Sequence, residues 1–459
     1  MEKKKSKTNL LQKFAEKFKK KKRSKSASMS RERGSEMSRR PRRPSRSASK
    51  TKVSGGNKEG GSPNASAETK SKIDLLEVTA KGIKSKESKE KKSSGEKKKE
   101  KQNIPTPTKT PSTMALRRTD SQMEVSQNNR CVEKQMKIWI DSLEKMDIRK
   151  VLETEYEGIE KMKADAEKCQ VFEKKLDQCS SESIELLDAN RVKGGGEDKD
   201  FFYHGSVLNC PTTPPKTTIL AQLPLIDNAE SLESFWLMVA AQKIQRIYVL
   251  AGEEEFDKKQ LSDYFPDDFK EHKTIRVNHR KTLPKTDDQL NNQLYYEVVP
   301  KDCAEAPFCM VEICDFWDDG RVPVKDYARI ATTAASVFDS DIDADASCGI
   351  VSFYGAGRTG AFLVGALAIE KLRSGEQPNY KDLGTCIRSQ RPGAIEVLSQ
   401  YIFSHTIGLT YGMKHCKDAG LKTRIEKLIA QFETLACAKM AEEEEEDSSS
   451  NATNSNTCE

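Results

Sequence analysis

The sequence lacks the marks of a secreted, metal-binding or membrane-spanning protein. Its 12 cysteines are scattered over 459 residues, and none stands in a C-x-x-C pair or another spacing typical of disulfide frameworks or zinc sites. No segment approaches the ~18–20 consecutive apolar residues that a membrane-spanning helix needs. The N-terminus is charged and lacks the apolar run of a signal peptide. We therefore expect a cytoplasmic protein with reduced thiols, without a metal or a cofactor.

Charge is divided unevenly along the chain. Residues 1–124 contain 37 Lys and Arg against 14 Asp and Glu, a net charge of +23. The remainder contains 41 basic and 57 acidic residues, a net charge of −16, so the whole-chain value of +7 conceals a basic arm joined to an acidic body. This division predicts one tail and one large globular domain rather than several domains.

The basic arm, residues 1–128, is predicted to be largely disordered. It is rich in Ser, Lys, Arg, Gly and Pro and carries too little apolar surface to offset the entropy of ordering. The exception is residues 9–23, where apolar side chains at helical spacing are surrounded by lysines and predict an amphipathic helix. These apolar side chains are Leu10, Leu11, Phe14 and Phe18.

Three interpretations of residues 9–25 remain open. The segment can lie on an anionic membrane surface, where each basic residue adds about 1 kcal/mol of attraction. It can instead carry a nuclear-import patch, "KKKKRSK", or adhere weakly to polyanions. It can also be a passive, solvated tail. We expect a place at the inner membrane surface, with the nucleus as the alternative, and we do not expect nucleic acid as the partner.

Residues 129–415 are predicted to form a single α/β (α+β) domain, in which helices flank one highly twisted mixed sheet. Helical periodicity is clear in "KQMKIWIDSLEKM" and "VKDYARIATTAASVF", and strand-like runs include "IQRIYVLA", "FCMVEICDF" and "CGIVSF". The last of these strands runs directly into "YGAGRTG", which a long apolar helix follows. A strand, a glycine loop and a helix in this order direct backbone N–H groups at an anion.

The loop "GAGRTG" is by itself a weak signal. It lacks the Lys-Ser/Thr pair that closes a nucleotide-binding loop, and it is too short for the dinucleotide fingerprint. A tight strand–helix turn without any ligand would also account for it.

The surroundings of this loop resemble those of the protein tyrosine phosphatases. Ser352 and Arg358 have the Cys-x5-Arg spacing of that family, and "GRTG" matches the end of its signature. "FWDDGRVP" resembles the family's mobile Trp-Pro-Asp loop. "IRSQRPGAIEVLSQYIF" resembles its glutamine-containing loop, in a form similar to that of nematode phosphatases. The resemblance implies the phosphatase fold and partners that carry phosphotyrosine.

The resemblance also implies a role for each site position. Backbone amides and a planar guanidinium would hold the phosphate oxygens. Asp319 aligns with the general acid, and Thr359 matches the hydroxyl that steadies a departing thiolate. Glu396 and Gln400 align with the two glutamines that position water. The phosphate-binding positions are Gly355, Ala356, Gly357 and Arg358.

Several of these positions depart from the family pattern. The nucleophilic Cys is replaced by Ser352, and the His expected before it is Val351. A hydroxyl is a poor nucleophile without a base to activate it. Glu396 adds negative charge where phosphate should approach. We therefore expect a pseudophosphatase that acts as a scaffold or regulator in phosphotyrosine signalling; the alternatives are a phosphotyrosine trap through Arg358 and a phosphatase with residual activity.

The C-terminal part of the chain extends beyond the phosphatase-like region. Residues 416–440 carry apolar side chains along one helical face, which predicts an additional helix that packs on the body or binds a partner. Residues 441–459 contain "EEEEED" followed by a Ser- and Asn-rich end. This composition predicts a disordered acidic tail.

Overall fold

The computed structural model describes residues 129–194, 201–252, 255–256, 261–287, 289–301, 306–317, 322–339 and 346–454. The basic arm, with the helix predicted at 9–23, lies outside these ranges, and so does Asp319.

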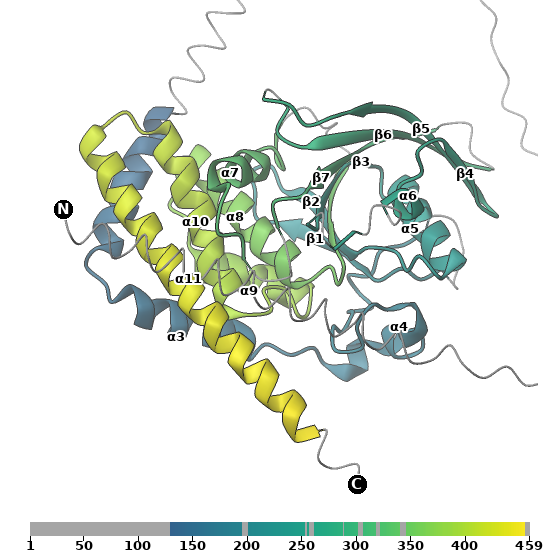
Figure 1. The fold of residues 1–459 in the computed structure, drawn as a ribbon, viewed down its shortest axis with the longest axis horizontal. Coiled ribbons are helices and arrows are strands. Elements are labelled where there is room, and N and C mark those ends of the chain that lie inside the picture. Colours follow the sequence, from purple (N-terminus) through teal and green to yellow (C-terminus); the bar gives the residue numbers. More distant parts are fainter. Residues whose placement is uncertain are drawn as a thin grey trace, which may run out of the picture. The chain divides into compact units, whose positions relative to one another are not determined.

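An eight-stranded mixed sheet forms the centre of the domain (Figure 1). Its strand order is β1-β2-β8-β3-β7-β6-β5-β4. The strands from β2 to β7 in this order pair in parallel, and the strands on either side pair antiparallel. The prediction of one mixed sheet between helices is confirmed. The strands are β1 (Gly205–Cys210), β2 (Lys216–Gln222), β3 (Ile244–Leu250), β4 (Phe269–Glu271), β5 (Ile275–Leu283), β6 (Asn292–Pro300), β7 (Phe308–Cys314) and β8 (Ser347–Ser352).

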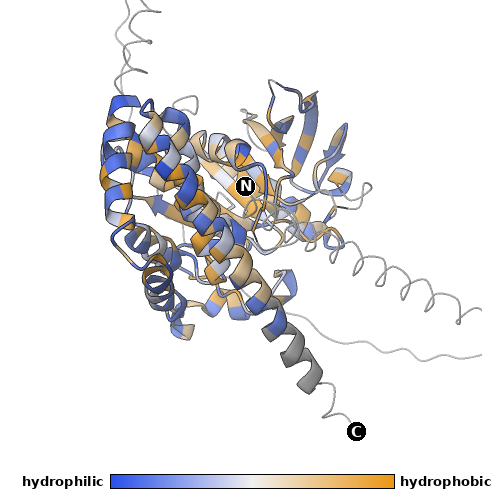
Figure 2. Cartoon of the chain, turned by 60° about the vertical axis from the view of Figure 1, so that its left-hand side comes forward, coloured by the Kyte–Doolittle hydropathy of each residue, from blue (hydrophilic) through white to orange (hydrophobic). Residues whose placement is uncertain are grey.

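Helices cover both faces of this sheet. Because successive side chains of a strand point to opposite faces, Tyr248 of β3 packs with one helical layer and Val249 with the other. Figure 2 shows hydrophobic residues gathered in the strands between the helices, whose outer faces carry hydrophilic residues. The first layer contains residues 129–143, α3 (Ile148–Glu160), α7 (Tyr327–Ala335), α8 (Gly357–Arg373), α9 (Tyr380–Gln390), α10 (Leu398–His415) and α11 (Ala419–Asn454), and the second contains α5 (Ala229–Ala241) and α6 (Leu261–Tyr264). The short α4 (Gln170–Glu173) precedes β1.

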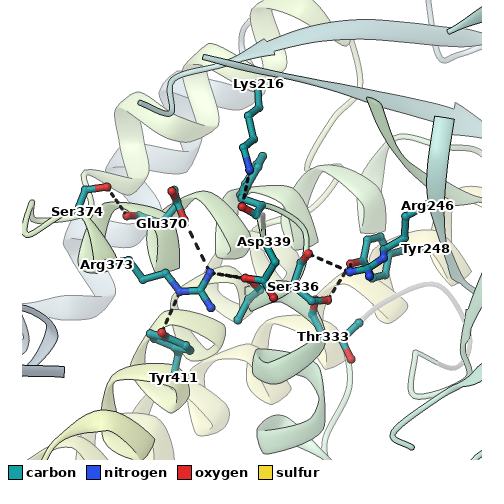
Figure 3. Close-up of polar contacts among 12 residues, drawn as sticks. Lys216, Arg246, Tyr248, Thr333, Ser336, Asp339, Glu370, Arg373, Ser374 and Tyr411 are labelled. Atoms are coloured by element: carbon teal, nitrogen blue, oxygen red, sulfur yellow. Dashed lines mark hydrogen bonds and ion pairs between the residues drawn. The ribbon is translucent and has the colours of Figure 1, made fainter. Parts of the chain in front are cut away.

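Cationic side chains converge on the C-terminal end of α7 (Figure 3). Lys216 donates a hydrogen bond to the carbonyl oxygen of Phe338, and Arg246 donates one to that of Ser336. Arg373 donates to the carbonyl oxygen of Ala335, the last residue of α7, at 2.8 Å and binds the carboxylate of Asp339 at 2.9 Å. The last carbonyls of a helix have no partners within it and carry partial negative charge, so these cations stabilise the helix end. These contacts hold α7 in place. The helix begins at Tyr327, shortly after residues 318–321, which include Asp319 and lie outside the described ranges.

The C-terminal helix α11 is longer than the sequence predicted. It runs from Ala419 to Asn454, so residues 441–454, predicted to be a disordered tail, are helical. Their glutamates favour a helix, and Glu443 accepts hydrogen bonds from Ser399 of α10. The first part of α11 packs on the body as predicted, since Ile425 and Phe432 are fully buried in the core. Residues 455–459 lie outside the described ranges.

Ten cysteines in the described residues are free, and six of them are buried. Burial raises the pKa of the Cys348 thiol, on β8, to about 12, so this thiol is protonated and unreactive at neutral pH. The same stretches of chain contain no group of three or more His, Cys, Asp or Glu side chains that could hold a metal ion. None of the helices in them is both long and apolar enough to cross a bilayer.

Four aromatic rings connect the terminal helices through the core. Trp139 stacks on Tyr380 with ring centroids 5.5 Å apart, and Tyr380 stacks on His405 at 3.7 Å. Phe432 of α11 also stacks on His405, with centroids 5.5 Å apart. Burial lowers the pKa of His405 to about 3, so this imidazole is neutral at physiological pH.

Acid should therefore destabilise the protein through His405. The folded-state pKa lies below the unfolded value of about 6.5, so the unfolded chain binds the extra proton first. The free energy of unfolding should be constant above about pH 6.5 and should fall by about 1.4 kcal/mol per pH unit between pH 6 and 4 through this residue alone. His405→Phe, which keeps a ring in the stack, should have a shallower slope in urea unfolding at a series of pH values. An unchanged slope would show that His405 does not carry this proton linkage.

Candidate active site

The loop between β8 and α8 turns tightly against the end of β2. Gly355 has a φ of +64°, in the left-handed region that favours glycine. A Cβ atom at this position would lie 2.1 Å from the carbonyl carbon of Ala221, so no side chain fits there. The loop opens directly into the N-terminus of α8 at Gly357. The structure thus places the four predicted phosphate-binding positions, 355–358, where backbone N–H groups and a helix N-terminus favour an anion.

Ser352, at the nucleophile position, is the last residue of β8 and only 2% exposed. Its Oγ accepts a hydrogen bond of 3.0 Å from the amide of Gly355. Within the described ranges, no imidazole or carboxylate is hydrogen-bonded to this hydroxyl. The preceding residue, Val351, is buried against the α5 layer and offers no proton acceptor. Among the described residues, none is therefore placed to activate the Ser352 hydroxyl.

Arg358 is held by a carboxylate from a distant part of the chain. Its two terminal nitrogens donate to the two carboxylate oxygens of Glu255 at 2.6 and 2.8 Å, a bidentate pair. One of them also donates to the carbonyl oxygen of Trp317 at 3.3 Å. Side-chain exposure is 5% for Arg358 and 19% for Glu255. The pair with Glu255 orients the guanidinium of Arg358. A guanidinium has five N–H donors, so donors remain for a further acceptor.

The two aromatic residues of the loop point to different places. Phe353 packs with the core layer around α5, and its ring centroid lies 5.6 Å from that of Phe256. Tyr354 is 49% exposed, and its carbonyl oxygen accepts a hydrogen bond from Arg391. Phe353 is therefore part of the core, and the ring of Tyr354 meets solvent.

The loop that resembles the Trp-Pro-Asp loop is described only at its two ends. Trp317 is fully buried and packs edge-on against Phe403 of α10, with centroids 5.1 Å apart. Its carbonyl oxygen binds Arg358, so the start of this loop contacts the candidate site. The predicted general acid, Asp319, lies outside the described residues and stays a prediction.

Glu396 and Gln400 both face the loop. A Cβ atom added to Gly357 would lie 2.8 Å from Oε1 of Gln400 and 2.9 Å from Oε2 of Glu396. Gln400 is buried, and its Oε1 accepts a hydrogen bond of 2.9 Å from the amide of Glu396. The two predicted positions are thus brought together beside the first residue of α8. The carboxylate of Glu396 therefore lies beside the N-terminus of α8.

The backbone just before Glu396 is strained. Ile395 has a φ of +59°, a region that β-branched residues rarely adopt. Arg388 of α9 holds this turn by donating to the carbonyl oxygens of Ala394 and Ile395 at 2.8 and 3.0 Å. Tyr156 of α3 donates to the carbonyl oxygen of Glu396 at 2.6 Å. Neighbouring helices thus maintain a conformation that the isolated segment would not adopt.

Thr359 uses its hydroxyl within its own helix. Its Oγ1 donates to the carbonyl oxygen of Ala356 at 3.2 Å, and the residue is fully buried. The amide of Gly360 binds the same carbonyl at 2.8 Å. Both contacts stabilise the first turn of α8.

Arg391, which was not predicted as a site residue, also supports the loop. Its guanidinium is fully buried and donates to the carbonyl oxygen of Gly355 at 3.0 Å. It also donates to Nδ1 of His204 at 3.2 Å. Burial lowers the pKa of Arg391 to about 10. No carboxylate in the described residues forms an ion pair with it, so loop carbonyls and an imidazole balance this charge instead.

The contacts of His204 define its protonation state. Arg391 can only donate, so Nδ1 of His204 accepts, and Nε2 carries the proton that bonds the carbonyl oxygen of Ile184 at 2.9 Å. Burial, and then the charge of Arg391, hold the pKa of His204 well below its usual value. His204 is therefore a structural histidine that fixes Arg391.

Comparison with known proteins identifies the chain. The profile of the family described as protein-tyrosine phosphatase matches residues 175–410. A Caenorhabditis elegans protein named "Putative tyrosine-protein phosphatase B0280.11" is 62% identical over 97% of this chain and 98% of its own length. The chain belongs to the protein-tyrosine phosphatase family. The resemblance inferred from its motifs is confirmed.

Two more distant similarities accompany this match. Another Caenorhabditis elegans protein, "Putative tyrosine-protein phosphatase C15H7.3", is 20% identical over 40% of this chain and 45% of its own. The solved structure of the protein tyrosine phosphatase TcPTP1 from Trypanosoma cruzi aligns with a TM-score of 0.48 and 14% identity, over 57% of this chain and 91% of that one.

Proposed function

We propose that this protein-tyrosine phosphatase family member is non-catalytic and acts by binding, as a scaffold or regulator in phosphotyrosine signalling. The observation that carries the proposal is the environment of Ser352. The covalent route needs a nucleophile that is ionised or activated by a base, and the one side-chain hydrogen bond of Ser352 in the described residues comes from the Gly355 amide, which is not a base. Direct attack by water also lacks support, since Glu396 stands where a neutral glutamine would orient that water.

A second function, phosphotyrosine capture, is favoured by the way Arg358 is held. Glu255 fixes the guanidinium beside the N-terminus of α8, and donors remain for a phosphate group. Capture without turnover would keep phosphorylated partners bound to the chain. The carboxylate of Glu396 opposes this function, so we expect modest affinity.

The basic arm gives a separate proposal about location. We propose that residues 9–25 attach the chain to an anionic membrane surface at the cytoplasmic side, with nuclear import as the alternative. Binding of the full chain to phosphatidylserine vesicles should be lost when Phe14 and Phe18 are both replaced with alanine. Loss of nuclear accumulation upon replacing the "KKKKRSK" lysines, with vesicle binding absent, would favour the alternative.

Calorimetric titration of the full chain with a phosphotyrosine peptide pool, and with the same peptides unphosphorylated, tests the two functions. Arg358→Lys is the matched variant, because lysine keeps the charge that Glu255 needs but loses the bidentate fork. Phosphate-dependent binding that Arg358→Lys weakens at least about tenfold would establish capture. Binding without phosphate dependence would establish a scaffold. Continuing heat after mixing would indicate hydrolysis and contradict both.

The loop should still be able to lower a thiol pKa. In Ser352→Cys, the amide of Gly355 and the N-terminus of α8 should stabilise a thiolate, with a pKa below about 7 against an ordinary 8.5. Thiolate absorbance at 240 nm, read as the difference between this variant and the wild-type protein, measures it. The buried Cys348 four residues earlier does not contribute near neutral pH. A thiol at 352 that titrates above pH 8.5 would show that the loop no longer favours an anion.

A further inference from the structure

The acidic end of α11, defined here as residues 441–445, lies against the N-terminus of α10. Helices α10 and α11 pack along one another (Figure 1). At the end of this contact, Glu443 accepts hydrogen bonds from the amide and the Oγ of Ser399, at 3.1 and 2.8 Å. Ser399 is fully buried.

Glu443 supplies a cap that α10 lacks. The N-cap residue of α10 is Val397, which has no side chain to accept a hydrogen bond from the first turn. A carboxylate at this place satisfies a free amide and interacts favourably with the positive end of the helix dipole. The N-terminal cap of α10 is therefore supplied by Glu443, which lies 44 positions after Ser399 in the sequence.

The same turn of α10 faces the phosphate-binding loop. Gln400 follows Ser399 directly, and both Gln400 and Glu396 lie against Gly357. Ile395, just before them, is held in a strained conformation that requires support from its neighbours. Glu443 is thus connected through one helical turn to the residues beside Arg358.

The acidic end is attached less firmly than the rest of α11. Phe432 and Ala436 are buried in the core. Beyond them Met440 is only partly buried against the core, and two ion pairs follow: Lys439 with Glu153 at 3.1 Å and Glu442 with Arg149 at 3.6 Å, the latter pair about half exposed. Exposed ion pairs contribute little, so this end can open locally while the helix core stays in place.

We infer that the acidic end of α11 is an intramolecular brake on anion binding at the phosphate loop. This inference rests on the proposed function in one respect, since it presumes that the loop binds phosphate. Glu443 places a negative charge at the N-terminus of α10, within one helical turn of Gln400 and Glu396, which lie against Gly357. Release of the acidic end takes this negative charge away from the loop, so that phosphate binds more tightly.

Tungstate titration and amide hydrogen exchange of the full chain test the brake. Glu443→Gln removes the charge, and Glu443→Ala also removes the hydrogen bonds. Both should lower the dissociation constant for tungstate about two- to fivefold at low salt, the range expected for one charge at a helix N-terminus. Glu443→Ala should also speed exchange at the Ser399 amide. Glu445→Gln, an exposed carboxylate on the same segment, is the matched control and should change neither.

The possible results separate the brake from a general charge effect and from a failure of phosphate capture. Unchanged tungstate affinity in both Glu443 variants, with wild-type binding measurable, would overturn the brake. An equal gain in Glu445→Gln would overturn it as well, because the effect would then be general charge rather than this contact. Tungstate binding by none of the proteins, with faster exchange in Glu443→Ala, would contradict phosphate capture itself while leaving the Glu443–Ser399 contact established.

Discussion

Replacing Glu255 with alanine is expected to lower the free energy of unfolding by about 2–4 kcal/mol. The substitution leaves the guanidinium of Arg358, 5% exposed, without its carboxylate in the interior. An uncompensated buried charge costs more than the pair itself contributes, because the desolvation penalty remains when the attraction is removed. Glu255 also accepts a hydrogen bond of 2.9 Å from the amide of Gly252, which is lost too. Urea unfolding followed by tryptophan fluorescence measures the change.

The double variant Glu255→Leu with Arg358→Met separates charge from packing. It removes both ions, so its stability should lie much closer to that of the wild-type protein than Glu255→Ala does. Glu157→Ala is the surface control, since the Glu157–Lys161 pair is exposed, and no measurable change is expected there. A Glu255→Ala protein as stable as wild type would mean that Arg358 has another counterion and that the loop is not organised by this pair.

Phe432→Ala is expected to have an effect of similar size, about 3–5 kcal/mol. Phe432 is fully buried and covers His405, so its removal opens a cavity between α10 and α11. Because the acidic end of α11 follows Phe432, the loss should also release the Glu443–Ser399 contact. Chemical denaturation measures the first effect, and hydrogen exchange at Ser399 measures the second.

Two controls accompany Phe432→Ala. Phe432→Leu keeps most of the buried volume and should cost about 1 kcal/mol. Gln431→Ala, next to it on the exposed face, should stay within about 0.5 kcal/mol of wild type. Destabilisation by Gln431→Ala as large as that by Phe432→Ala would mean that α11 is held by something other than its apolar face.

The strand–loop–helix unit around Ser352 and Arg358 could be predicted because its signals are local. The glycines, the arginine and the apolar flanks lie within a few residues of one another, and their order decides how the backbone turns. The positions Glu396 and Gln400 could also be placed, since a motif fixes their spacing and the fold brings the motif to the loop.

The partners of the loop could not be predicted, because tertiary packing alone selects them. Glu255 lies 103 residues from Arg358, in a segment with neighbouring glutamates, and nothing in the sequence distinguishes it from them. Arg391 stands inside a recognised motif, but its burial under Gly355 depends on how α9 meets the sheet. The predicted tail at residues 441–454 is wrong because glutamates also favour a helix, and contacts with α10 and α3 accompany a continuous helix there.

Phosphate release from phosphotyrosine peptides by the purified full chain tests the central claim most directly. The measurement compares the wild-type protein with Ser352→Ala, which differs from it by a single oxygen atom. We predict release by both at the rate of the buffer blank, because the described residues offer the Ser352 hydroxyl no base. Release by the wild-type protein that Ser352→Ala abolishes would contradict it and would make the chain a serine-dependent phosphatase.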